Sequence, residues 1–168
     1  MIRTFKGTSP AVDSSAYVDI SAQVIGDVHI GAESSVWMNV VIRGDVNHIR
    51  IGKRTNIQDL TMVHVMREAH PTLIGDEVTI GHSAVVHGAT IEDRVLIGMA
   101  AVLLNGVHVG HDSIVAAGTL VAEGTRIPPR SLVMGRPAKV RRELTDAEVA
   151  EIRGYADNSV RYRLDYQS

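Results

Sequence analysis

The chain has 168 residues, which is enough for one domain with a hydrophobic core and too few for two domains of ordinary size. Its net charge of −2 and lack of any basic run exclude an electrostatic case for nucleic-acid binding, and the absence of cysteine excludes disulfides and thiolate metal ligands. Without a signal-peptide-like stretch or a window near the ~18 apolar residues of a membrane helix, we expect a cytoplasmic protein that does not bind membranes.

Aliphatic residues recur at every sixth position over most of the chain. The series runs through Val12, Val18, Val24, Ile30, Val36 and Ile42, resumes at Ile51, Ile57, Val63, Ile74, Ile80 and Val86, and continues from Ile91 to Val133. Glycine follows the aliphatic position at Gly31, Gly52, Gly75, Gly81, Gly98 and Gly110. A period of six with a small or left-handed-tolerant residue beside each apolar one predicts short strands joined by turns, since a helix would repeat near 3.6.

Short strands of this kind bury almost no apolar surface alone, so they must stack, with each coil covering the next. Three six-residue units per coil would make a triangular prism with the aliphatic side chains inside. The pattern resembles the hexapeptide-repeat, left-handed parallel β-helix family, and the handedness is what that resemblance implies. Extra residues around 43–50 and 67–72 predict loops that leave the prism. We expect a mainly β chain with this β-helix over residues 1–140.

The remaining segment, residues 141–168, predicts one α-helix packed on the β-helix. Prolines at positions 128, 129 and 137 are expected to stop the pairing of strands before it. Thr145 and Glu148 form the Thr-x-x-Glu pattern of a capping box, which predicts a helix over about 146–162. The side chains spaced to face the prism are Val149, Ile152, Tyr155 and Ala156.

Two histidines are predicted to lie in one column. Ile57 and Ile80, like Val63 and Val86, are separated by one coil of eighteen residues plus the five-residue insertion. His64 and His87 each follow a stacked aliphatic residue and therefore share a column, ~4.8 Å apart at the backbone. That spacing suits two ligands of one metal ion, and the same count places Arg43 at the foot of the column.

His82 belongs to the preceding face of the prism, so it cannot easily turn to the same metal within its own chain. A ligand from a second chain would place the site between subunits, and cyclic symmetry around a three-sided prism predicts a homotrimer. The nearby Asn56, Gln58 and Asp59 could hold ligands or water. The remaining histidines, at positions 29, 48, 70, 108 and 111, have no comparable polar residues or histidines at coil-related positions and are expected at the surface. Glu68 is expected to be an ordinary loop residue, although an acid there could also carry protons.

These residues resemble the γ-class carbonic anhydrases. The segments that carry the resemblance are R43-G-D45, N56-I-Q-D59, H64-V and G81-H82-S-A-V-V-H87-G. The resemblance implies that His64 and His87 of one subunit and His82 of the next bind zinc, with iron or cobalt possible on the same ligands. It also implies that Gln58 hydrogen-bonds a metal-bound hydroxide, that Arg43 and Asp59 pair across the interface, and that Asp45 and Asn56 support them. Tyr155 and Asn158 could reach the pocket, although no motif fixes that match.

The function implied is that of a lyase, the reversible hydration of carbon dioxide to bicarbonate by the metal hydroxide. Three neutral imidazoles leave the charge of the metal intact and one position open, which suits this chemistry. Val46 stands where the best-studied members carry an acid, so proton export could be slow. Two alternatives stay open: a metal-dependent acyl-CoA thioesterase or acyltransferase, since G135-R-P-A resembles a segment of hexapeptide acyltransferases, and a non-catalytic metal-stabilised trimeric scaffold.

Overall fold

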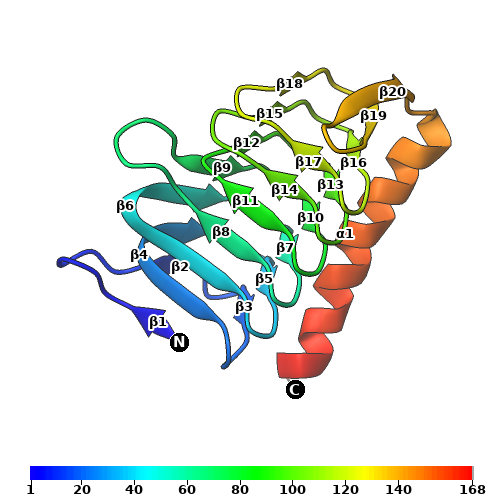
Figure 1. Ribbon diagram of the computed structural model, residues 1–168. Helices are drawn as coiled ribbons and strands as arrows, with labels where there is room; N and C mark the ends of the chain where they lie inside the picture. Colours follow the sequence, from blue (N-terminus) through cyan, green and yellow to red (C-terminus); the bar gives the residue numbers. More distant parts are fainter. Residues whose placement is uncertain (168) are drawn as a thin grey trace.

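A computed structural model describes residues 1–167 and shows twenty short strands followed by one helix (Figure 1). The strands are β1 Ile2–Arg3, β2 Ala11–Val12, β3 Tyr17–Val18, β4 Gln23–Ile30, β5 Ser35–Val36, β6 Val41–Ile51, β7 Asn56–Ile57, β8 Met62–His64, β9 Thr72–Ile74, β10 Thr79–Ile80, β11 Val85–His87, β12 Thr90–Ile91, β13 Leu96–Ile97, β14 Val102–Leu103, β15 His108–Val109, β16 Ile114–Val115, β17 Leu120–Val121, β18 Arg126–Ile127, β19 Ser131–Met134 and β20 Lys139–Glu143. The helix is α1, Asp146–Gln167.

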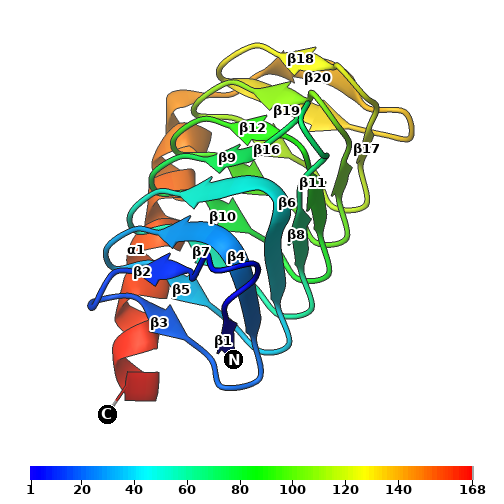
Figure 2. The ribbon, with the colours of Figure 1, turned by 90° about the vertical axis from the view of Figure 1, so that its left-hand side faces the viewer.

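The strands wind into a three-faced stack of coils, seen along its side in Figure 2. One face is a parallel sheet of strands β3, β5, β7, β10, β13, β16 and β19. Strand β20 extends this sheet by pairing antiparallel with β19. The other two faces run through β8, β11, β14, β17 and through β9, β12, β15, β18, and the long strand β6 pairs with both. The predicted mainly β fold, with parallel coils and a C-terminal helix, is confirmed.

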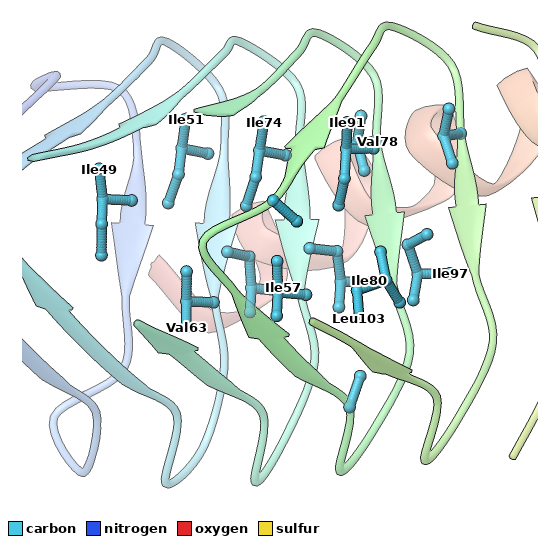
Figure 3. Packing of buried hydrophobic residues seen from close by; sticks show 14 of the residues in the cluster. Ile49, Ile51, Ile57, Val63, Ile74, Val78, Ile80, Ile91, Ile97 and Leu103 are labelled. Atoms are coloured by element: carbon cyan, nitrogen blue, oxygen red, sulfur yellow. The ribbon is translucent and has the colours of Figure 1, made fainter. Parts of the chain in front are cut away.

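Columns of aliphatic side chains fill the interior (Figure 3). Ile57, Ile80 and Ile97 are in register on successive coils, and each is 0% exposed. Each coil therefore covers the apolar side chains of its neighbour, which is why a six-residue period produces a core here although no single strand could.

The glycines of the repeat serve close packing of coils rather than turns. A Cβ built at Gly98 would lie 2.4 Å from the backbone nitrogen of Ala117 on the next coil, which is too close for any side chain. The left-handed corner positions are occupied instead by other residues, such as Glu33 at φ 57° and Arg54 at φ 55°. A small residue and a left-handed residue therefore both occur near the aliphatic positions, but at different places in the turn.

The two insertions behave differently. Residues 67–72 leave the prism as predicted, in a loop closed by a bridge between Met66 and His70. Residues 43–50 do not form a loop, because they stay within β6, which pairs with β4 on both sides of a register shift between Gly26 and Val28. The extra residues are absorbed as an irregularity of a paired strand, so the backbone remains paired on both sides of them.

The parallel stack ends within residues 127–140, as predicted, although β19 follows Pro128 and Pro129 and still pairs with β16. One coil earlier, Gly110 donates its N–H to the carbonyl of Ile127 on the coil above. Strand β18 is the last of its face, so an N–H at position 128 would have no acceptor above it. Proline is therefore tolerated there, because the donor it lacks is not needed.

Helix α1 lies along the face that contains β10 and β13 and runs back toward the N-terminal coil (Figure 1). The predicted capping box is present: the N–H of Thr145 donates to Glu148 Oε2 at 2.9 Å, and the N–H of Glu148 donates to Thr145 Oγ1 at 3.3 Å. Val149 and Ile152 are buried against Leu96, Ile114 and Leu132 of the prism. No helix among residues 1–167 is long and apolar enough to cross a membrane.

Two expectations about α1 are wrong. The helix ends at Gln167 rather than near residue 162. Its last turns are held by Arg163, which is 5% exposed and donates to the carbonyl of Ser15 at 2.8 Å. Tyr155 does not pack into the prism, since it is 42% exposed and hydrogen-bonds Glu151. Ala156 is buried as predicted, and Ser159 is buried as well.

The ion pair at the start of α1 predicts a pH-dependent stability. Arg142 donates to both carboxylate oxygens of Glu148, at 2.8 and 2.7 Å, and this pair with the Thr145 N–H lowers the pKa of Glu148 to about 2. A carboxylate whose pKa falls on folding stabilises the folded state above its unfolded pKa of about 4.5, and the effect disappears as pH falls toward about 2. Thermal unfolding should show Glu148→Gln to be less stable than wild type at pH 6 and equal to it near pH 2. A difference that stays constant over this range would contradict the assignment, and Glu151→Gln controls for loss of an acid on the same helix.

Candidate metal centre

Parallel pairing of β8 with β11 places His64 directly beside His87, as predicted. His64 Nδ1 lies 3.1 Å from His87 Nε2, and the ring centroids are 5.0 Å apart. Both side chains are partly buried. Two imidazole nitrogens thus face each other on one surface of the prism.

The outer nitrogen of His64 is bound by a carboxylate. His64 Nε2 lies 2.9 Å from Asp45 Oδ1, and Arg43 pairs with the other oxygen of Asp45. Burial alone would raise the pKa of Asp45, but the hydrogen bonds from His64 and Arg43 outweigh it and lower that pKa. Burial also lowers the pKa of His64, against the opposing effect of Asp45. His64 is therefore a neutral ring that donates Nε2–H to Asp45 and keeps a lone pair on Nδ1.

The outer nitrogen of His87 is bound by an amide. His87 Nδ1 lies 2.7 Å from Asn105 Oδ1, and Asn105 Nδ2 donates to Glu123 Oε1 at 3.0 Å. With its proton on Nδ1, His87 keeps a lone pair on Nε2, so two lone pairs converge. Tetrahedral coordination at ~2.0–2.1 Å would separate two nitrogen ligands by about 3.3 Å, close to the observed distance. These residues fit a divalent cation.

His82 lies apart from this pair. It follows β10 on the face that α1 covers, it is about half exposed, and its Nδ1 lies 2.9 Å from Asp59 Oδ2. Among residues 1–167, no group of three or more histidine, aspartate or glutamate side chains within one chain is placed to hold a metal. This agrees with the expectation that His82 cannot join His64 and His87 of its own chain.

Asn56, Gln58 and Asp59 gather around His82 rather than around the histidine pair. Asn56 is buried, donates to Thr79 Oγ1 at 2.8 Å and accepts a hydrogen bond from Gln58 Nε2 at 3.3 Å. The predicted site residues therefore form two half-sites. The first comprises Arg43, Asp45, His64 and His87, and the second comprises Asn56, Gln58, Asp59 and His82.

A cavity of about 530 Å³ adjoins the second half-site, between the prism and α1. Its lining includes Gln58, Asp59 and His82, together with Tyr155 and Asn158 from the helix. Trp37, Tyr162 and Tyr166 also line it and were not predicted. The spacing of tyrosines 155, 162 and 166 at seven and four residues places them on one helical face. This pattern could have predicted that they line the same side of the cavity.

Asn105 and Glu123 were also missed. They follow His87 at intervals of eighteen residues, which is one coil each. The spacing argument that joined His64 to His87 would have joined these residues to the same column. Glu68 and the remaining histidines make no hydrogen bond or ion pair to either half-site among those described for residues 1–167, although Thr72 at the end of the loop donates to the carbonyl of His64 at 2.6 Å. His108 and His111, for example, pair with Glu92 and Asp112.

Comparison with known proteins gives three informative matches. A family model described as hexapeptide repeat of succinyl-transferase matches residues 71–99 and 88–122. Gamma carbonic anhydrase 1, mitochondrial, of Arabidopsis thaliana is 54% identical over 155 residues, covering 89% of this chain and 56% of that protein. A Methanocaldococcus jannaschii protein named "Probable carbonic anhydrase" is 52% identical over 141 residues, covering 84% of this chain and 86% of that protein.

Among solved structures, a hexapeptide transferase family protein from Anaplasma phagocytophilum has a TM-score of 0.95 and 38% identity, covering 98% of this chain and 97% of that one. This chain spans little more than half the length of the plant relatives it matches. The Arabidopsis proteins are named as mitochondrial, and the cytoplasmic location of this chain stays a prediction.

The convergent lone pairs predict uptake of about one divalent ion per chain. His64→Ala and His87→Ala should each abolish tight uptake, because either change leaves a single nitrogen of the pair. His111→Ala removes a histidine that pairs with Asp112 elsewhere and should retain it. Elemental analysis after loading with zinc and gel filtration measures the stoichiometry. Equal loading of all four proteins would contradict the assignment.

Proposed function

Because this chain belongs to the γ-class carbonic anhydrase family, we propose that it catalyses the reversible hydration of carbon dioxide to bicarbonate. The observation that carries the proposal is the pair of nitrogen lone pairs of His64 and His87 facing each other at 3.1 Å beside the Arg43–Asp45 ion pair. A metal site of imidazoles next to a fixed cation suits a reaction that consumes a neutral molecule and produces an anion.

His64 and His87 would hold the metal, with zinc as the expected ion and iron or cobalt compatible with the same ligands. When bound, such a cation supplies Lewis acidity, which makes water a usable nucleophile near neutral pH. The third ligand is His82 of another chain. Its Nδ1 lies 2.9 Å from Asp59 Oδ2, which leaves Nε2 as the nitrogen available to a metal, and its half-exposed side chain is accessible to a second subunit.

Gln58 would orient the nucleophilic water. Its Nε2 donates to Asn56 Oδ1, so its carbonyl oxygen remains available as an acceptor for a proton of that water. Asn56 is buried and bonded to Thr79, which holds the Gln58 amide in this orientation. A lone pair of the water oxygen is then directed at the carbon of carbon dioxide.

Arg43 would bind the product anion. Its side chain is 40% exposed, which leaves the guanidinium accessible, and Asp45 fixes it within reach of the histidine pair. A guanidinium matches the two oxygens of bicarbonate. Asp45 thus serves two groups at once, since it positions Arg43 and accepts the Nε2 proton of His64.

The complete site would lie between subunits of a homotrimer. Each half-site lacks what the other has: the histidine pair lacks a third ligand and an orienting amide, and the His82 half-site lacks a second ligand. Joining the half-sites of adjacent chains completes both requirements, and cyclic closure of three chains gives three equal sites.

Carbon dioxide hydration measured on the metal-loaded protein tests the activity. Hydration that is lost on chelation and restored by zinc is the expected result. A panel of acyl-CoA thioesters should be assayed in parallel, because the high structural similarity to a transferase-family protein favours acyl transfer or thioester hydrolysis as the second candidate. Thioester cleavage without hydration would support that candidate, and metal binding without turnover would support a structural role.

Complementation between variants tests the interface. His64→Ala and His82→Ala should each be inactive, yet a mixed trimer contains one interface at which all three ligands are intact. With equal random mixing, roughly three quarters of trimers are mixed and each recovers one site in three, so activity should return to about a quarter of wild type. If all ligands came from one chain, co-refolded variants would stay as inactive as each variant alone.

A further inference from the structure

We propose that Asn105, held by Glu123, is the positioning residue that fixes the ring of His87 with its proton on Nδ1 and so presents Nε2 to the metal. This inference rests on the metal site of the proposed function. It assigns a role to two residues on the two coils that follow His87.

The direction of each hydrogen bond follows from Glu123. A carboxylate accepts and does not donate, so the group 3.0 Å from Glu123 Oε1 must be the amide nitrogen of Asn105. The amide oxygen therefore points to His87, 2.7 Å from Nδ1, and it can only accept. Nδ1 must carry the proton, and the lone pair of the neutral ring is left on Nε2.

The backbone is built to admit this contact. A Cβ built at Gly88 would lie 2.6 Å from Asn105 Oδ1, so a side chain at position 88 would displace the amide. Gly88 also has φ +59°, a conformation that other residues adopt at a cost. The N–H of Gly124 donates to the carbonyl of Asn105 at 2.9 Å, and the N–H of Gly106 donates to that of Gly88 at 2.8 Å. Asn105 is thus fixed to the coils on both sides of it.

Without the Asn105 oxygen as acceptor, His64 and His87 could form a hydrogen bond with each other. His87 could carry its proton on Nε2 and donate it to His64 Nδ1, which lies 3.1 Å away. Both metal-binding nitrogens would then be occupied by one proton, and a metal would have to displace it. The amide of Asn105 prevents this arrangement, because its oxygen would face an unprotonated Nδ1 at 2.7 Å.

The three candidate ligands differ in their outer partners. His64 donates to the carboxylate of Asp45, and His82 lies 2.9 Å from the carboxylate of Asp59, whereas His87 donates to a neutral amide whose own partner is a carboxylate. A neutral acceptor cannot take the proton from the ring, so it sets the tautomer while leaving the negative charge one residue farther from the metal.

The test compares variants of the 168-residue chain by two measurements. Asn105→Leu removes the acceptor while keeping the branched shape of the side chain, and Glu123→Lys replaces the outer acceptor with a donor, which should turn the amide around. Asn105→Asp combined with Glu123→Gln restores an acceptor for His87 and a donor for the new carboxylate. Asn47→Leu is the matched control, because the Asn47 amide bonds the carbonyl of Met66 and no histidine ring.

Nitrogen-15 NMR of the metal-free protein at pH 8 reports the tautomer of His87, and competition with a chelator gives the dissociation constant for zinc. Wild type and control should show the Nδ1–H form. Asn105→Leu and Glu123→Lys should shift toward Nε2–H and bind zinc about 10- to 100-fold more weakly, and the double variant should regain both properties.

An Nε2–H ring in the wild type, or unchanged tautomer and zinc affinity in Asn105→Leu, would overturn the inference. The tautomer measurement needs no metal, so it decides the inference even if wild type takes up no zinc, which would reject the proposed function. Zinc binding that depends on Asn105, in a protein without hydration activity, would reject carbonic anhydrase activity and support the inference.

Discussion

The stacking of parallel coils is the constraint from which the rest of this structure follows. Each short strand donates and accepts hydrogen bonds with the coil before and the coil after it, so residues one coil apart in sequence are neighbours in space. The same register that stacks Ile57 on Ile80 sets His64 beside His87 and brings Asn105 within reach of the latter. One repeat therefore builds both the core and the candidate site. The column of outward-facing residues that contains His64, His87 and Asn105 can change without disturbing the inward-facing residues of the core.

This regularity decides how much could be predicted from sequence. Spacing alone identified the interior columns and the pairing of His64 with His87, because a parallel ladder converts distance in sequence into distance in space. It failed where the environment of one residue overrides the repeat. Pro128 is accepted only because no coil lies above it, and Tyr155 is a partly exposed wall of the cavity beside α1 rather than a residue packed into the prism. Neither the edge of a face nor the rotation of a packed helix is encoded in a six-residue period.

A histidine becomes a candidate ligand here through its neighbours, and the other histidines show the contrast. His108 bonds Glu92 at 2.7 Å, much as His64 bonds Asp45, but no second imidazole is described opposite its free nitrogen. An outer acceptor merely orients a ring, whereas two oriented rings facing each other concentrate unshared electron pairs in one place. That arrangement is unfavourable unless a cation lies between them, and this makes the pair a stronger indication of metal than the number of histidines nearby.

Strand β20 covers the edge of the last coil and ends the sheet. It adds antiparallel to β19, and all five of its residues are exposed, with Lys139, Arg141 and Arg142 among them. An open ladder would offer unpaired backbone groups to any strand-forming chain, including a second copy of this one. A strand that paired with β20 would instead have to remove water from three basic side chains beside its own backbone. Growth of the coil stack into a fibre is thereby disfavoured at this end of the prism.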